Sequence, residues 1–365
     1  MVVTSEILKK RVSAARELMR RHRLEAALFF KPASVRYLSS LEATSAAVLL
    51  TRRSRLLFTD FRYLEEARVH ARGFRIKAVK GRLPLALGGV LSKSGIRRLG
   101  FESSGISHAF YRLMKRGLGK GIALVPLAGD VDCMRAVKDP GEVRLLRKAA
   151  RIAESALDCF CEIVREGMTE REVAAILDAH MRIEGSERAS FDTIVASGRR
   201  AAMPHAKASG RKIRRGEPIL VDLGAVVGGY HSDLTRTFFL SRIPPGCRAV
   251  YERVIEAQIA AIASLIEGAQ AAEVDGIARK VIDKAPKVGD FGHGLGHGVG
   301  LEVHEAPVLS PASKDVLRSG MVVTVEPGIY RRGSFGIRIE DMVLVTKTGA
   351  RPLTDFPKNI EEVVI

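Results

Sequence analysis

The stretch FGHGLGHGVGLEVHEAP, residues 291 to 307, concentrates three histidines and two glutamates among glycines at every second position from Gly292 to Gly300. Glycine at this spacing is costly inside a helix, so we expect an extended segment. Missing side chains allow another backbone or a ligand to approach closely. No register of these glycines fits the G-x-G-x-x-G pattern of dinucleotide binding. The stretch therefore favours histidines that project beside open space, which suits a metal or substrate site better than a nucleotide site.

A second chemically suggestive stretch is ILVDLGAVVGGYHSDLTRTFFL, residues 219 to 240. Its Gly228-Gly229 pair predicts a two-residue hairpin turn. Counting back from the turn places Asp222 opposite Thr235, and puts Asp222 and Asp233 on one face as diagonal neighbours. The other face is almost entirely apolar and is expected to pack. Two carboxylates that meet beside a core repel each other unless a cation lies between them, which predicts a metal ion.

A third block, MVVTVEPGIYRRGSFGIRIEDMVLV, completes the set of candidate ligands. A strand ends at Glu326, and Arg338 and Glu340 lie at spacing two on one strand face. Each acid alone is more commonly a solvated strand or turn residue. Together they form a set of four carboxylates and one imidazole: Asp222, Asp233, His297, Glu326 and Glu340. Such an oxygen-rich set suits Mn²⁺, Co²⁺ or Fe²⁺ better than a structural thiolate zinc site.

The elements that position these residues predict two domains. Asp139, Pro140 and Glu142 form a helix start with a capping box, and we place the domain boundary after residue 137. Residues 1–137 alternate helical stretches with short apolar runs and are expected to form an α/β domain. Residues 138–365 show two helices followed by strands, twice, with the second helix pair beginning near residues 247 and 272. This order predicts a pseudo-duplicated α+β domain.

Charge is distributed unevenly along the chain. Residues 1–140 hold 28 Lys and Arg against 11 Asp and Glu, whereas residues 141–365 hold 31 against 30. Neither a secretory apolar region nor a stretch of about 20 apolar residues is found, so we expect a cytoplasmic protein with no membrane contact. The N-terminal basicity raises nucleic acid as a partner, although the acidic metal ligands argue against nucleic-acid binding as the main function.

These motifs, in this order and spacing, closely resemble the pita-bread metallopeptidases, and specifically the proline-specific branch that contains aminopeptidase P and prolidase. The resemblance covers most of residues 137–365 through PHA at 204–206, VDLGA, YHSDLTRTF, GHGLGHGVGLEVHEAP, VTVEPGIY and GIRIED. The N-terminal region resembles the smaller creatinase/prolidase-like domain of the same branch. Methionine aminopeptidases share the catalytic fold but commonly lack such a domain.

The resemblance implies roles for individual residues. It makes the five candidate ligands above the holders of two divalent metal ions, with Asp233 and Glu340 bridging. Mn²⁺ is the expected metal, with Co²⁺, Fe²⁺ or Zn²⁺ as alternatives. It also implies that Glu326 acts as a proton shuttle as well as a ligand, that His205, His293 and His304 contact substrate, and that Arg338 supports the ligands.

The implied reaction is hydrolysis of the Xaa-Pro bond in proline-containing peptides. Some dipeptidases of this branch carry an Arg one residue after the HExP motif, and this chain has Val308 there. That departure favours an Xaa-Pro aminopeptidase, with an Xaa-Pro dipeptidase as the alternative. A relative of another class, a non-catalytic protein or nucleic-acid binder on the same fold, is a further alternative, as is a metal-free creatinase-like enzyme, although all five ligands are present. We expect a homodimer or a higher homo-oligomer.

Overall fold

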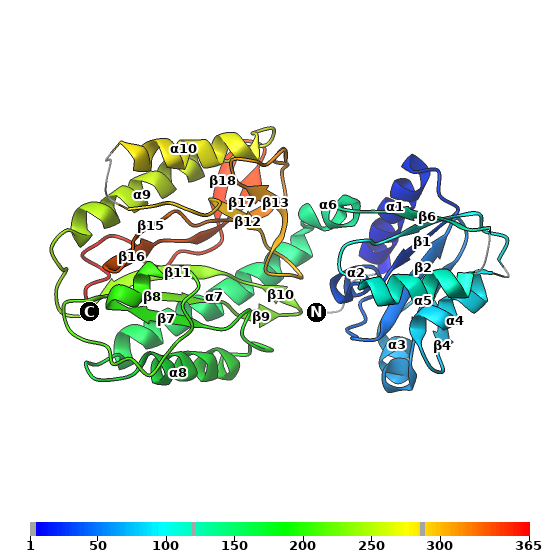
Figure 1. Cartoon of the computed structure of the whole chain (residues 1–365), viewed down its shortest axis with the longest axis horizontal. Coiled ribbons are helices and arrows are strands. Elements are labelled where there is room, and N and C mark those ends of the chain that lie inside the picture. The colour runs from blue at the N-terminus through cyan, green and yellow to red at the C-terminus, as the bar shows by residue number, and fades with distance from the viewer. Residues whose placement is uncertain (1–4, 93, 119–120, 285–288) are drawn as a thin grey trace. The chain divides into compact units, whose positions relative to one another are not determined.

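The computed structural model describes residues 5–92, 94–118, 121–284 and 289–365. The chain divides into two compact units, Met1–Arg135 and Ala136–Ile365. No helix among the described residues is long and apolar enough to cross a lipid bilayer. Each unit has its own layers of helix and sheet, which are labelled in Figure 1.

The first unit is built on a mixed six-stranded sheet with the strand order β4-β3-β2-β1-β5-β6. The apolar runs in the sequence become its strands, and the central strand β1 is buried at every position. Helix α6 (Asp130–Ala136) crosses the division between the units. The other elements are α1 Ser5–Arg21, β1 Ala26–Phe29, α2 Pro32–Ser39, β2 Ala46–Thr51, β3 Arg55–Thr59, η1 Phe61–Tyr63, α3 Leu64–His70, β4 Arg75–Ala78, α4 Leu83–Leu91, β5 Arg98–Phe101, α5 His108–Leu118 and β6 Ala123–Pro126.

The second unit repeats the order of two helices followed by strands, as the sequence predicted. In Figure 1 the helix pairs α7/α8 and α9/α10 lie on opposite sides of the strands. The first half contains α7 Pro140–Ile163, α8 Glu170–Ile183, β7 Ile194–Ser197, η2 Gly198–Ala202, β8 Pro218–Leu223, β9 Val226–Val227, β10 Tyr230–His231 and β11 Leu234–Phe239. The second half contains α9 Cys247–Ala263, α10 Ala271–Asp283, β12 Gly296–Gly298, β13 Glu305–Leu309, β14 Val322–Val325, β15 Gly328–Arg331, β16 Phe335–Arg338, β17 Asp341–Thr346 and β18 Gly349–Pro352.

Local signals begin the helices of the first half. At α7, the Asp139 side chain accepts from the backbone N–H of Glu142, and the Glu142 side chain accepts from that of Asp139. Thr169 and Glu172 form the same reciprocal pair at α8. Each pair satisfies N–H groups that the helix leaves without intrahelical partners. Both predicted capping boxes are confirmed.

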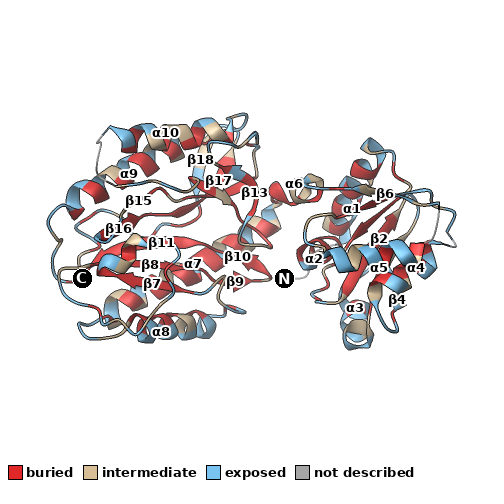
Figure 2. Ribbon diagram, viewed as in Figure 1, coloured by how far each residue is buried: buried red, intermediate tan, exposed pale blue. Residues whose placement is uncertain are grey.

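The hairpin register also follows the prediction. Val227 pairs with Tyr230, and Asp222 pairs with Thr235. The strands form a three-stranded sheet of order β11-β8-β7, and their apolar face joins the main core of the unit. Figure 2 shows these strands buried along their length, between helices with exposed outer faces. The second half supplies a five-stranded sheet of order β13-β12-β14-β17-β18 and the hairpin β15-β16.

The glycine-rich stretch is extended around β12, as expected. A Cβ at Gly296 would lie 2.0 Å from the Thr324 carbonyl oxygen, and one at Gly298 would lie 2.2 Å from that of Ala306. Neither position has room for a side chain, because neighbouring backbone occupies the space. The glycines therefore let β12 pack tightly while His297 between them keeps its side chain.

Candidate metal centre

Five strands, or the residues next to them, deliver the five candidate ligands to the middle of the second unit. Asp222 lies in β8 and Asp233 directly precedes β11. His297 lies in β12, Glu326 directly follows β14, and Glu340 lies between β16 and β17. The two halves join at this point, because the Glu340 N–H donates to the Thr235 carbonyl at 3.1 Å.

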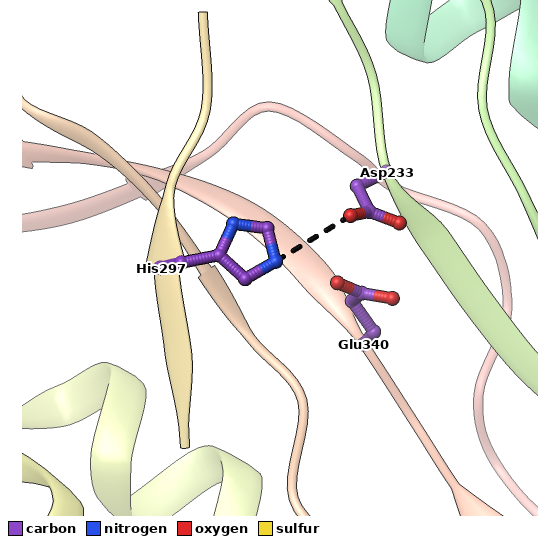
Figure 3. Close-up of side chains that lie close together, drawn as sticks. All are labelled: Asp233, His297 and Glu340. Atoms are coloured by element: carbon purple, nitrogen blue, oxygen red, sulfur yellow. Dashed lines mark ion pairs between the residues drawn. The ribbon is translucent and has the colours of Figure 1, made fainter. Parts of the chain in front are cut away.

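Three of the side chains come together closely. One ligand atom each from Asp233, His297 and Glu340 lies within 4.8 Å of the others, and Figure 3 shows the three groups pointing toward one another. His297 Nε2 lies 3.6 Å from Asp233 Oδ2 and 3.4 Å from Glu326 Oε1. Glu326 therefore adjoins the triplet through His297.

The tautomer of His297 indicates which kind of ligand fits between its ring and the carboxylates. Burial lowers the pKa of His297 to about 4, so its imidazole is neutral near pH 7. Its Nδ1 lies 3.1 Å from the Gly298 carbonyl oxygen, which can only accept a hydrogen bond, so Nδ1 carries the proton. The lone pair on Nε2 consequently faces carboxylate oxygens. A lone pair and carboxylates directed at one space favour a cation there.

The carboxylates give the same result. Burial, together with the charges of neighbouring acids, raises the pKa values of Asp233 and Glu340 well above their ordinary values. Burial also raises the pKa of Asp222, and that of Glu326 to about 7. Asp222 Oδ1 and Glu340 Oε1 are buried with no hydrogen-bond partner in the described chain. Oxygens that are buried, repelled and unpartnered fit a divalent metal centre.

Arg338 and Thr235 position two of the carboxylates through hydrogen bonds. The Arg338 guanidinium donates to Asp222 Oδ2 at 2.5 Å and to Thr235 Oγ1 at 3.1 Å. Thr235 in turn donates to Glu340 Oε2 at 2.7 Å. Each contacted carboxylate is thus fixed through one oxygen, while its other oxygen is the unpartnered one.

The three other candidate histidines surround this cluster. The ring centroids of His304 and His297 lie 4.3 Å apart, and His304 and His205 are both exposed to solvent. His205 lies near enough to His293, His304 and Asp222 to affect their pKa values. Burial lowers the pKa of His293 to about 4. His293 is therefore neutral near pH 7 and can act as a hydrogen-bonding group beside the cluster.

Tyr330 and the bridging contacts of Thr235 were not predicted from the sequence. The Tyr330 hydroxyl lies 3.0 Å from His293 Nε2 and accepts from Arg338 Nη1 at 3.0 Å. Because His293 Nδ1 lies 2.8 Å from the Gly294 carbonyl, its proton is on Nδ1 and Tyr330 donates to Nε2. The hairpin register could have indicated Thr235, since it pairs directly with Asp222.

Comparisons with known proteins agree with this geometry. Residues 144–347 match the model of metallopeptidase family M24, and residues 11–137 match that of the creatinase/prolidase N-terminal domain. An Xaa-Pro dipeptidase of Pyrococcus horikoshii is 37% identical over 97% of this chain and 99% of its own.

Solved structures show the same similarity. An Xaa-Pro dipeptidase from Bacillus anthracis superposes with a TM-score of 0.93 at 34% identity, covering 98% of this chain and 100% of that one. An X-Pro aminopeptidase from Thermotoga maritima gives 0.88 at 35% identity, covering 96% and 98%. The α+β fold of the second unit is the pita-bread fold that the sequence resemblance predicted, and the chain belongs to metallopeptidase family M24.

Proposed function

We propose that this chain is a dinuclear-metal peptidase that hydrolyses Xaa-Pro bonds. The observation that carries the proposal is the His297 Nε2 lone pair, which faces the buried Asp233 carboxylate. The neighbouring carboxylates of Asp222 and Glu340 each have one buried oxygen without a hydrogen-bond partner among the described residues. Family membership makes the metal catalytic rather than structural, and full-length relatives named Xaa-Pro dipeptidase and X-Pro aminopeptidase support proline specificity. We assign catalysis to residues 138–365 and treat residues 1–137 as the N-terminal domain.

Two divalent cations fit the donor set. The residues that would hold them are Asp222, Asp233, His297, Glu326 and Glu340. Mn²⁺ is the proposed native metal, with Co²⁺, Fe²⁺ and Zn²⁺ as alternatives. Such a pair supplies Lewis acidity toward a peptide carbonyl and lowers the pKa of water.

The protein's own groups supply orientation and proton transfer. Glu326 lies beside His297 Nε2 and is our candidate for moving a proton at its carboxylate from the attacking water to the leaving nitrogen. His304 is our candidate donor to the developing oxyanion, because it is exposed next to His297. His205 and His293 are assigned to the substrate, and Arg338 to holding Asp222. An Xaa-Pro bond has no N–H and a restricted φ, so binding it requires dedicated contacts of this kind.

Two substrate lengths are compatible with the site. Relatives named Xaa-Pro dipeptidase favour dipeptides. Val308, which is exposed, is the residue after the HExP motif. Some dipeptidases have an Arg at this position, so Val308 favours peptides that continue beyond proline. We place the enzyme in the cytoplasm as a homodimer or higher homo-oligomer, with proline-containing peptides as its partners.

The test compares Mn²⁺-loaded protein on matched Xaa-Pro dipeptides, Xaa-Pro-Xaa tripeptides and Xaa-Ala peptides. We expect cleavage of proline substrates only, and loss of cleavage on chelation. Glu340→Gln should lower both metal content and kcat/KM, whereas Glu361→Gln, at an exposed position of the same unit, should change neither. Equal rates on Xaa-Ala and Xaa-Pro peptides would remove the proline assignment, and hydrolysis that persists in chelator would remove the metal assignment.

A further inference from the structure

A pocket of about 600 Å³ lies in the second unit, away from the metal centre. It opens where β8 begins, at Pro218, and where β16 begins, at Phe335. Asp222 and Arg338 lie three to four residues further along the same strands, which corresponds to roughly 10–13 Å. The pocket is therefore distinct from the catalytic space.

The charge of this pocket is unusual for its surroundings. Its lining carries four arginines and one glutamate: Arg199, Arg211, Arg214, Arg331 and Glu217. Residues 141–365 as a whole are nearly neutral, with 31 basic against 30 acidic side chains. The surplus of positive charge is thus local, and it lies in a concave site rather than on a convex solvated face.

Part of this lining is held in place before any ligand binds. Arg211 donates through Nη2 to both oxygens of Glu217, at 2.8 and 2.7 Å, and through Nη1 to Ser197 Oγ at 2.5 Å. A Cβ at Gly198 would lie 2.8 Å from Arg211 Nη2, so glycine there leaves room for the ion pair. The Arg331 guanidinium lies over the Phe335 ring, 5.5 Å from its centroid.

Two arginines of the lining, Arg199 and Arg214, are available to a ligand. Glu217 is engaged by Arg211, and neither Arg199 nor Arg214 has an ion pair or side-chain hydrogen bond to any part of the chain that the structure describes. Pro218, Pro244 and Pro245 supply an apolar wall. Guanidinium groups together with apolar prolines in one lining suit an amphipathic anion.

We propose that this arginine pocket binds a small molecule with a diphosphate group. Arginine presents paired N–H donors that match phosphoryl oxygens, and Arg199 and Arg214 bring two such groups to one pocket whose carboxylate, Glu217, is engaged by Arg211. A terminal phosphoryl group carries about −1.5 to −2 charges near neutral pH, and the linked phosphoryl group of a diphosphate adds a further negative charge for the second arginine. Inorganic pyrophosphate and a nucleoside diphosphate share this chemistry, and the volume lies within the usual range of ligand pockets.

The experiment measures binding of ADP and of inorganic pyrophosphate to the Mn²⁺-loaded full chain by isothermal titration calorimetry. The test variant is Arg199→Glu/Arg214→Glu, whose positions are exposed, and the matched control is Arg182→Glu on the exposed face of α8. Withdrawal of metal by the probe affects all three proteins alike, so the difference between them reports the pocket. Thermal melts verify that the variants fold.

We expect saturable binding that the double variant weakens by about tenfold or more for each arginine lost, and that Arg182→Glu leaves unchanged. Tighter binding of ADP than of pyrophosphate would identify a nucleotide, and equal binding would identify the diphosphate group as the whole determinant; both support the pocket. No binding at millimolar probe, or equal affinities in wild type and double variant, would overturn the proposal.

Discussion

Removing the buried cation Lys138 is the substitution for which the structure gives the clearest magnitude. Its ammonium lies 3.1 Å from Glu305 Oε2, and both side chains are only 1% exposed. The Glu305 carboxylate also accepts from the Glu302 N–H, which ties down the loop that carries His304. Lys138→Met keeps a long apolar stem but leaves a buried carboxylate without this charge partner.

Breaking one side of a buried ion pair costs about 3–5 kcal/mol, because the remaining charge stays desolvated without its counter-ion. One kcal/mol shifts the melting temperature by about 2–4 °C in a domain of 150–250 residues. We therefore expect Lys138→Met to melt roughly 6–20 °C below wild type. Lys138→Met/Glu305→Gln should recover part of this loss in melting temperature, because the buried carboxylate charge is then removed.

The assay is thermal unfolding of the Mn²⁺-loaded proteins followed by circular dichroism. Lys207→Met is the matched control, because Lys207 faces Asp192 at 3.6 Å with both side chains more than 85% exposed, and such pairs contribute about 0–1 kcal/mol. A Lys138→Met melting temperature equal to that of Lys207→Met would refute the reasoning. If the pair also positions His304, kcat/KM at 25 °C should fall in Lys138→Met and not in Lys207→Met.

Three further outcomes are expected. His304→Ala should lower kcat by about 10²–10³ if it donates to an oxyanion, and a near wild-type kcat would assign His304 to structure. In metal-free protein, burial holds the pKa of Glu326 at about 7 against an ordinary 4.5, so between these values the folded state binds more protons than the unfolded state. Thermal stability should therefore fall as pH rises from 5 to 7.5, and Mn²⁺ should restore it. A flat profile of melting temperature against pH would contradict this. The basic N-terminal region is expected to be a solvated surface, so free-acid peptides and their C-terminal amides should show the same dependence of kcat/KM on salt; a selective loss for the free acid would instead indicate steering of carboxylates.

The sequence predicted the parts of the site that local rules determine. The two-residue turn at Gly228-Gly229 sets the register of its hairpin, and alternation then decides which side chains share the face with Asp222. The same holds for the helix starts, where the capping residues lie three apart in sequence. In these places the interacting groups are neighbours along the chain or across one turn.

Contacts between distant segments were not predictable in this way. Arg338 reaches Asp222 across 116 residues, and Tyr330 reaches His293 across 37, because two sheets meet at the centre of the unit. The arginine pocket likewise combines three segments: residues 198–218, 244–247 and 331–335. The residue pattern within one segment cannot predict these contacts, because they depend on how separate layers of the fold pack against each other.

The duplicated architecture predicts that metal binding and folding are linked in this chain. The first half contributes Asp222 and Asp233, the second contributes His297, Glu326 and Glu340, and the sheets bring them together only when the halves join. Joining the halves buries acids that raise one another's pKa values, so in the absence of a cation the same packing that forms the core also concentrates like charge. Arg338 offsets part of that charge through Asp222, but it leaves Glu340 Oε1 and Asp222 Oδ1 without partners. We therefore expect a divalent cation that engages these oxygens to stabilise the joined halves through the same contacts that would hold it for catalysis.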